Sequence, residues 1–173
     1  MAKTRSKKTR LKPLVGVVMG SDSDLPVVQR CLDMLESFGI GYEVRVISAH
    51  RTPAIAHEYA ATAERRGLKL IVAAAGMCAA LGGVMAAGTT LPVIGIPMAS
   101  GPLAGVDAAL STMQMPPGVP VACMAIDKAG ATNAAIFAAQ VLALSDKRLA
   151  AKLAKFRKDQ AAQVVAKDEG LKR

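Results

Sequence analysis

The stretch Pro13-Leu14-Val15-Gly16-Val17-Val18-Met19-Gly20 decides the fold, because it is a nearly unbroken apolar run that ends in glycine. An apolar run without alternation is typical of a strand buried on both faces, as in a parallel sheet. The polar run Ser21-Asp22-Ser23-Asp24 follows directly and offers residues that cap the start of a helix. Residues 25–39 then carry apolar side chains at helical spacing before a glycine stop: Val28, Leu32, Leu35 and Phe38. The stretch therefore predicts a strand, a turn and a helix.

The same order of strand, loop and helix recurs along the chain. Further strands are predicted at residues 42–48, 68–74, 92–98 and 120–126. Helices are predicted at residues 54–67, 80–90 and 131–144, with another within residues 101–118. Strands that alternate with helices of this length form a parallel sheet covered on both faces. We therefore expect an α/β fold, a three-layer doubly wound domain of about five strands over residues 13–145.

The length and composition fit one domain with an aliphatic core. The 173 residues are enough for a single domain with a sizeable core and are short for two. Hydrophobic residues make up 52% of the chain but aromatic residues only 3%, so alanine, valine, leucine, isoleucine and methionine must fill the interior. Such a core suits closely packed helices and buried parallel strands.

The net charge of +9 is concentrated at the two ends of the chain. Residues 1–12 contain six basic residues and no acidic one, and residues 145–173 contain nine basic and four acidic residues. Residues 13–144 contain seven basic and nine acidic residues, so the central domain is slightly acidic. The leader, residues 1–12, can contact RNA phosphates but lacks the aromatic residues of a base-stacking platform. We expect a solvated, disordered leader and no specific nucleic-acid partner, with RNA binding as the alternative.

Residues 146–173 are predicted to form one further helix beyond the domain. Its apolar positions make an interrupted stripe among many charges: Leu149, Leu153, Phe156, Ala161 and Val164 or Val165. Such a stripe needs an apolar partner, which is either the helix's own domain or another subunit. The sequence does not decide between these two partners. The stripe also predicts an assembly larger than a dimer.

The cysteines and the start of the chain bear on the cellular compartment. Cys31, Cys78 and Cys123 lack the paired spacing of a zinc site or a redox dithiol, which indicates a reducing compartment. Cys31 and Cys123 are expected in the core, and Cys78 is a weak candidate nucleophile because no histidine lies near it in the sequence. No apolar stretch with the length and flanks of a signal peptide follows the leader, so we expect a cytoplasmic protein that is not in a membrane.

Three informative loops follow the first three predicted strands, at residues 20–24, 48–53 and 75–83. Ligands of open parallel sheets bind at the carboxyl ends of the strands, so these loops are expected to converge on one crevice. The first loop has the small residues and hydroxyls that suit a phosphate at a helix start. It lacks the glycine spacing of a dinucleotide site and the lysine of a P-loop, so a mononucleotide fits better. Plain helix capping by Ser21 or Asp24 is the alternative for this loop.

His50 in the second loop is the main candidate for catalysis. Its imidazole can give or take a proton near neutral pH, and Arg51 beside it can hold a phosphate or a carboxylate by two parallel hydrogen bonds. Ser48 and Thr52 add further hydrogen-bonding groups. A structural role is the alternative for His50, but its place beside Arg51 at the ligand end of the sheet favours proton transfer. The second histidine, His57, lies within the next predicted helix and is expected to be solvated and inactive.

Several motifs, in order over residues 14–145, resemble those of one family. They are GSDSD, SAHRTP, the glycine-rich third loop, PVIGIPM, GVDAALSTMQMPPGVPV and KAGATNAAIFAAQVLAL. The chain is similar to the 5-(carboxyamino)imidazole ribonucleotide mutases and aminoimidazole ribonucleotide carboxylases of purine biosynthesis. This resemblance implies an enzyme with a flavodoxin-like fold, no cofactor and no metal, assembled as a homo-octamer.

The resemblance also implies roles for residues of the first two loops. Ser21 and Asp24 match substrate-binding positions, with Asp24 on the ribose hydroxyls, and Ser48 and Arg51 match positions at the phosphate. The family's proton-transferring histidine matches His50. In these enzymes the carboxylate ends on an imidazole ring carbon. The electron-rich aminoimidazole is already a carbon nucleophile, so the protein need only orient it and move a proton.

The third loop, AGMCAALGG at residues 75–83, departs from both branches of the family. Mutases commonly read Ala-Gly-Gly-Ala-Ala-His-Leu-Pro-Gly, so Met77 and Cys78 replace Gly-Ala here and Ala80 replaces the histidine. The branch that takes carbon dioxide directly reads Ala-Gly-Xaa-Ser-Asn-Ala-Leu, which also differs. Backbone N–H groups and small side chains of this loop are expected to meet the imidazole ring and the migrating carboxyl group. The residues expected to do so are Gly76, Met77, Cys78 and Leu81.

The motifs SAHRTP, QMPPGVPV and KAGATNAA look more like the mutase branch. The predicted reaction is therefore the conversion of 5-(carboxyamino)imidazole ribonucleotide to 4-carboxy-5-aminoimidazole ribonucleotide, with His50 as acid and base. Direct carboxylation of aminoimidazole ribonucleotide by carbon dioxide is the alternative. A non-enzymatic mononucleotide-binding module is a further one, although a receiver domain would need an aspartate where the third strand ends in AAAG.

Overall fold

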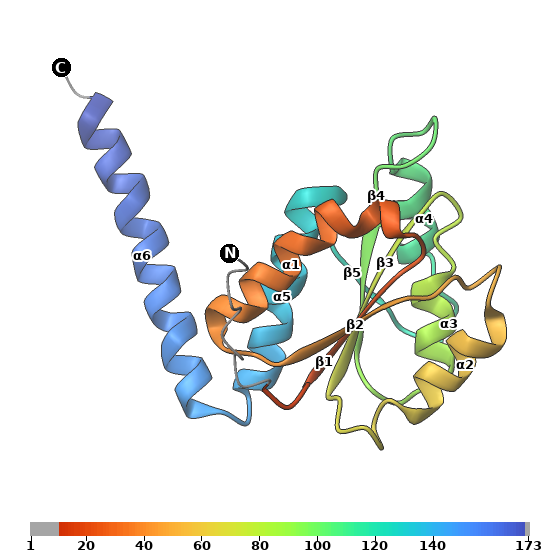
Figure 1. Cartoon of the computed structure of the whole chain (residues 1–173). Coiled ribbons are helices and arrows are strands. Elements are labelled where there is room, and N and C mark those ends of the chain that lie inside the picture. Colours follow the sequence, from red (N-terminus) through yellow and green to blue (C-terminus); the bar gives the residue numbers. More distant parts are fainter. Residues whose placement is uncertain (1–10, 172–173) are drawn as a thin grey trace, which may run out of the picture.

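The computed structural model describes residues 11–171, so most of the predicted leader lies outside the described residues. A five-stranded parallel sheet carries helices on both faces (Figure 1). The strands are β1 (Val15–Met19), β2 (Tyr42–Val46), β3 (Leu70–Gly76), β4 (Val93–Met98) and β5 (Ala122–Cys123). The helices are α1 (Leu25–Phe38), α2 (Pro53–Thr62), α3 (Leu81–Ala87), α4 (Val106–Met113), α5 (Asp127–Ala143) and α6 (Lys147–Leu171), with a 3-10 turn η1 (Asp22–Asp24).

The strand order β2-β1-β3-β4-β5 is that of a doubly wound, flavodoxin-like sheet. The chain moves outward from β1 to β2 and then crosses to β3 on the other side of β1, so the winding reverses between β1 and β3. α1 and α5 cover one face of the sheet, and α2, α3 and α4 cover the other (Figure 1). The predicted three-layer α/β fold is thereby confirmed. Ligand sites in this fold lie outside the carboxyl ends of the strands, where the winding reverses.

Burial of β1 on both faces explains its apolar run. All five of its residues are buried. Val15, Val17 and Met19 face the layer of α1 and α5. Val18 faces the layer of α2 and α3, and so does Gly16, where an added Cβ would lie 2.4 Å from the hydroxyl of Tyr59. Successive residues of β1 point to opposite faces of the sheet, as in any strand. Each helix layer therefore packs on apolar side chains of β1 or, at Gly16, directly on its backbone.

Small residues of α5 allow the helix to lie close to the sheet. Five of its alanines are fully buried: Ala131, Ala134, Ala135, Ala138 and Ala139. At Gly130 an added Cβ would stand 1.7 Å from the carbonyl oxygen of Ala125, so only glycine fits where the chain enters this helix. Close packing of small residues is how a core with so few aromatic side chains reaches a high density.

The structure differs from the predicted elements at the sheet edge. β5 is an edge strand of two residues instead of the predicted seven, because only Ala122 and Cys123 pair with β4. Its edge position also leaves Cys123 half-buried rather than in the core, whereas Cys31 on α1 is fully buried as predicted. α2 ends at Thr62, and residues 63–67 continue as turns up to Gly67, whose φ of 94° favours glycine.

Only the first part of α6 packs on its own domain. Leu149 is buried, and Leu153 and Phe156 pack against the core between α1 and α5, where the rings of Phe38 and Phe156 meet edge to face at 5.4 Å. The Lys152 ammonium donates a 2.6 Å hydrogen bond to the carbonyl oxygen of Phe38 at the end of α1. These contacts settle the partner of the first half of the predicted stripe as its own domain.

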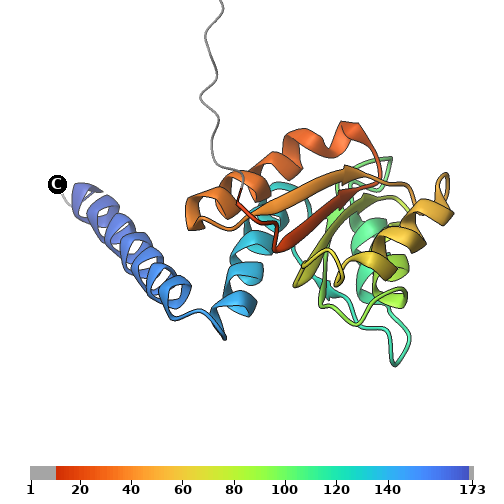
Figure 2. The ribbon, with the colours of Figure 1, turned by 60° about the horizontal axis from the view of Figure 1, so that its bottom comes forward.

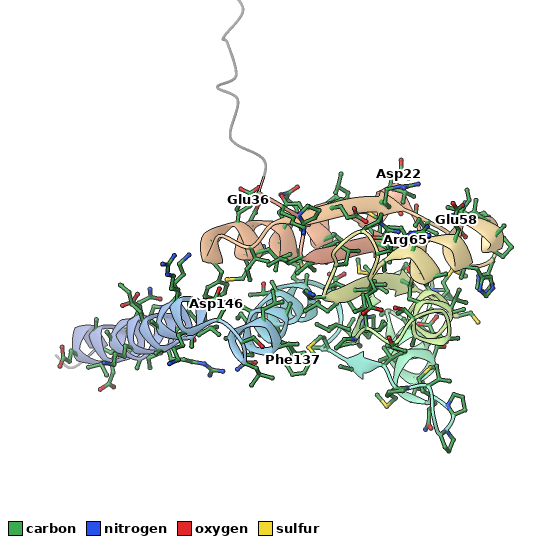
Figure 3. The ribbon with its side chains drawn as sticks, turned by 90° about the horizontal axis from the view of Figure 1, so that it is seen from below. Asp22, Glu36, Glu58, Arg65, Phe137 and Asp146 are labelled. Carbon is green, nitrogen blue, oxygen red and sulfur yellow. The ribbon has the colours of Figure 1, made fainter. Side chains whose placement is uncertain are left out.

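The second part of α6 extends away from the domain (Figures 1 and 2). Val164 and Val165 are 66% and 55% exposed. In Figure 3, Asp146 marks the turn between α5 and α6, beyond which the side chains of α6 point outward on several sides. Within residues 11–171, no helix is long and apolar enough to cross a membrane.

Candidate active site

A cavity of about 450 Å³ opens at the carboxyl ends of β1, β2 and β3. Its walls come from the three loops singled out in the sequence and from the loop after β4. Every predicted site residue lines it: Ser21, Asp24, Ser48, His50, Arg51, Gly76, Met77, Cys78 and Leu81. The strand order explains this convergence, because β1 lies between β2 and β3 and all three strands end at the same edge.

The first loop presents a pair of hydroxyls. Ser21 caps η1, because its Oγ accepts a 3.3 Å hydrogen bond from the backbone N–H of Ser23. The Ser23 hydroxyl donates a 2.8 Å hydrogen bond to the same oxygen. Both residues line the cavity. Ser21 therefore caps η1 and faces the cavity at the same time, so helix capping and ligand binding are compatible roles for this loop.

Asp24 is the buried acid of the cavity, with 9% of its surface exposed. Burial raises the pKa of its carboxyl group above the ordinary value, and the nearby carboxylates of Asp127 and Asp22 raise it further. A hydrogen bond from the backbone of Ser21 opposes the rise. Carboxyl groups with a raised pKa inside a cleft are typical of functional sites.

Arg51 connects the first two loops. Its Nη2 donates a 3.0 Å hydrogen bond to the carbonyl oxygen of Gly20, and its Nε donates a 3.3 Å hydrogen bond to Ser48 Oγ. The backbone N–H of Arg51 donates to the same Ser48 oxygen at 3.1 Å. These bonds occupy some of the guanidinium N–H groups and fix the orientation of the others. The guanidinium is therefore held where the ends of two strands meet, at a place where an anion can be bound.

Thr52 supports the second loop rather than the cavity. Its Oγ1 accepts a 3.0 Å hydrogen bond from the backbone N–H of Ser48 and donates a 2.9 Å hydrogen bond to the Ser48 carbonyl oxygen. It is absent from the residues that line the cavity. Its hydroxyl is therefore used in closing the turn that carries Ser48, His50 and Arg51.

His50 has an exposed imidazole at the cavity wall, between Ala49 and Arg51. It makes no hydrogen bond to another of the described residues, so both ring nitrogens are available to a ligand or to water. His57, on α2, is exposed as predicted and does not line the cavity. Of the two histidines, only His50 lines this cavity.

The third loop turns sharply beside the cavity. Met77 has a φ of 55°, a left-handed conformation that is uncommon for a residue with a side chain. The backbone N–H of Ala79 donates a 3.1 Å hydrogen bond to the carbonyl oxygen of Gly76 and closes the turn. Cys78 is exposed, whereas Leu81 begins α3 with 2% of its surface exposed and belongs to the core beneath the loop.

The predicted site residues are not the whole lining of the cavity. The lining also includes Gly20, Ser23, Ala49, Ala75, Ala79, Ala80 and Ser100. Ser100 is the one that lies outside the three predicted loops, since it follows β4. The rule that ligands bind at the carboxyl ends of strands, extended to the fourth strand, could have found it. In the described part of the chain, no cluster of three or more His, Cys, Asp or Glu residues could hold a metal ion.

Known proteins are similar to this chain over most of its length. The family model of AIR carboxylase matches residues 14–163. The N5-carboxyaminoimidazole ribonucleotide mutase of Pyrococcus abyssi is 53% identical over 147 residues, which cover 85% of this chain and 83% of that protein. The mutase of the same name from Bacillus subtilis is 52% identical over 143 residues, which cover 83% of this chain and 88% of that protein.

A solved structure agrees with these relatives. The crystal structure of PurE from Treponema denticola is 32% identical, with a TM-score of 0.80, and the match covers 93% of this chain and 99% of that one. The match therefore extends over nearly the whole of both chains. Together with the family model, it shows that this chain belongs to the AIR carboxylase family.

Proposed function

We propose that this chain is an N5-carboxyaminoimidazole ribonucleotide mutase of purine biosynthesis. The observation that carries the proposal is the cavity that joins the exposed His50 imidazole, the oriented Arg51 guanidinium and a glycine-rich loop at one edge of the sheet. Relatives that bear this enzyme name are about half identical to the chain. The cavity volume of about 450 Å³ suits a ligand of mononucleotide size.

In this proposal the first two loops hold the ribose phosphate. Arg51 and Ser48 bind the phosphate, with the guanidinium as the charged donor and the hydroxyl of Ser21 as a further donor. The carboxylate of Asp24 accepts hydrogen bonds from the ribose hydroxyls. Its burial supports this role, because a buried carboxylate gains most from donors that replace the lost water.

The proposed reaction breaks one bond to the carboxyl carbon, forms another, and moves one proton. The bond between the exocyclic nitrogen and the carboxyl carbon breaks, and a bond forms between that carboxyl carbon and the ring carbon. The ring carbon then loses its proton, and the exocyclic nitrogen gains one. His50 takes the first proton and returns a proton to the nitrogen, so the imidazole ends in its starting state. Gly76, Met77, Cys78 and Leu81 hold the ring and the migrating carboxyl group beside it.

Two further features of the enzyme are proposed with its function. We infer a homo-octamer, and its support is an apolar face in which residues from α4 and the preceding loop are each more than half exposed: Leu103, Val106, Leu110 and Met113. We also infer a cytoplasmic location, which the free cysteines support. Light scattering at micromolar concentration measures the assembly, and a monomer there would contradict the first inference.

His50→Asn is expected to abolish turnover while leaving the fold intact. Asparagine can accept and donate hydrogen bonds at this place but cannot carry a proton, so kcat should fall by roughly 10²- to 10⁴-fold. His57→Asn is the matched control, because His57 is exposed and lies outside the cavity. Product formation from the carboxyamino nucleotide and the thermal midpoint of each variant should be measured together. Near-normal kcat in His50→Asn would overturn the role of His50.

Asp24→Asn is expected to stabilise the folded chain at neutral pH. The folded-state pKa of Asp24 is raised above its ordinary value of 3.8, so the folded chain binds this proton more tightly than the unfolded chain does. As pH rises from the pKa of Asp24 in the unfolded chain to its pKa in the folded chain, ionisation of Asp24 lowers the free energy of unfolding. Above the folded-state pKa this decrease in stability stays constant. The asparagine variant has no such loss, so its advantage should be absent in acid and grow towards neutral pH.

Urea unfolding from about pH 4 to about pH 8 measures this advantage. Asp33→Asn is the control, because Asp33 is exposed on α1, does not line the cavity and should change the unfolding midpoint little. The same Asp24 variant should raise KM by roughly 10- to 100-fold, as expected for a lost charged hydrogen bond to the ribose. If Asp24→Asn were instead less stable than the wild type at neutral pH and not in acid, the surroundings of Asp24 would favour its ionised form, and the prediction would be wrong.

A further inference from the structure

The loop after β4 touches the third loop at two places on the cavity wall. β3 and β4 are hydrogen-bonded neighbours, and Gly76 at the end of β3 pairs with Met98 at the end of β4. A Cβ added to Gly76 would lie 1.6 Å from Ser100 Oγ. A Cβ added to Gly101 would lie 3.3 Å from the Cγ of Met77. Glycine therefore faces a side chain at each contact, and at Gly76 an added Cβ would overlap the Ser100 hydroxyl.

Ser100 is held in a fixed place by this fit. Its backbone N–H donates a 2.9 Å hydrogen bond to the carbonyl oxygen of Met98, which turns the chain tightly at the end of β4. Its hydroxyl then occupies the space that a side chain at Gly76 would fill. Ser100 is half-buried and lines the same cavity as His50. The absence of a side chain at position 76 thus determines where this hydroxyl stands.

The Ser100 hydroxyl forms no hydrogen bond with another of the described residues. A hydroxyl in a half-buried place is stable only when it finds a donor or an acceptor, and the open side of Ser100 is the cavity. Among the described lining residues that follow β3 and β4, Ser100 supplies the side-chain hydroxyl and Cys78 a thiol, and the others are apolar or glycine. The strand order puts this wall on the other side of β1 from the loop after β2, whose Arg51 is bound to Gly20 and to Ser48.

We propose that Ser100 is a further substrate-binding residue, whose hydroxyl donates a hydrogen bond to the migrating carboxyl group while Gly76 leaves the space for it. The inference rests on the proposed function, since it takes the phosphate to lie at Arg51 and the ring at the third loop. A carboxylate accepts a hydroxyl proton well, and this wall lacks a charged donor among the described residues. The hydrogen bond keeps the carboxyl carbon near the ring carbon as the bond to nitrogen breaks.

Ser100→Ala is expected to weaken binding of the carboxylated product far more than binding of aminoimidazole ribonucleotide, which lacks the carboxyl group. Titration calorimetry with the two nucleotides should give at least a tenfold rise in Kd for the first and little change for the second. Ser111→Ala is the matched control, because Ser111 lies on α4 outside the cavity and its hydroxyl donates to the carbonyl oxygen of Asp107. An equal change for both nucleotides, or none, would overturn the inference.

A second set of variants tests the fit between Ser100 and Gly76. Gly76→Ala should displace the Ser100 side chain and lower kcat as much as Ser100→Gly does, roughly 10- to 100-fold. The double variant Gly76→Ala/Ser100→Gly has room for the added methyl group, so its kcat should match that of Ser100→Gly alone. If the two single-variant losses in kcat instead added up in the double variant, the two residues would not act through the same contact. A wild-type chain that binds neither nucleotide would overturn the proposed function as well, whereas normal wild-type turnover with an unaffected Ser100→Ala variant overturns this inference alone.

Discussion

Burial of the sheet on both faces is the constraint on which the rest of this structure depends. A strand covered on two sides can carry only apolar side chains, and β1 satisfies this with every residue buried. Groups that bind or react must therefore lie beyond the strands. The doubly wound order leaves the ends of β2, β1 and β3 side by side, so His50, Arg51 and Asp24 meet at one cavity although 27 positions separate Asp24 from Arg51 in the chain. The fold thus produces the site by bringing the loops at these strand ends together.

The cavity has two sides with different chemistry. On the side of β1 and β2, Arg51 and Ser48 provide charged and neutral donors, and the hydrogen bond from Arg51 to Gly20 fixes their place. On the side of β3 and β4 the wall is made of small residues and backbone, where Gly76 admits Ser100. This division fits a ligand with an anionic end and a heterocyclic end. The exposed His50 imidazole lines the same cavity from the loop after β2, and in the proposed reaction it moves the proton to and from the ring.

Local patterns predicted most of the fold and the three loops, because apolar runs, glycine stops and helix caps depend on neighbours in the sequence. The rest depended on contacts between distant segments. The length of β5 follows from the two residues that pair with β4, and the partner of the first part of α6 follows from where Phe156 meets Phe38. Ser100 carries no motif, since its place is fixed by the space above Gly76 on the neighbouring strand. Leu81 was predicted at the ligand; it lines the cavity from the first position of α3, while most of its side chain packs in the core.

The departure of the third loop from both branches of the family makes the origin of the carboxyl group the central question. The chain should be offered the carboxyamino nucleotide with a ¹³C-labelled carboxyl group, in a buffer that contains unlabelled bicarbonate. A mutase keeps the carboxyl carbon within the site, so the account predicts that the ring-carboxylated product carries the label, as measured by mass spectrometry. A product whose carboxyl group is unlabelled would show that the carbon comes from dissolved carbon dioxide, and it would contradict the proposed reaction.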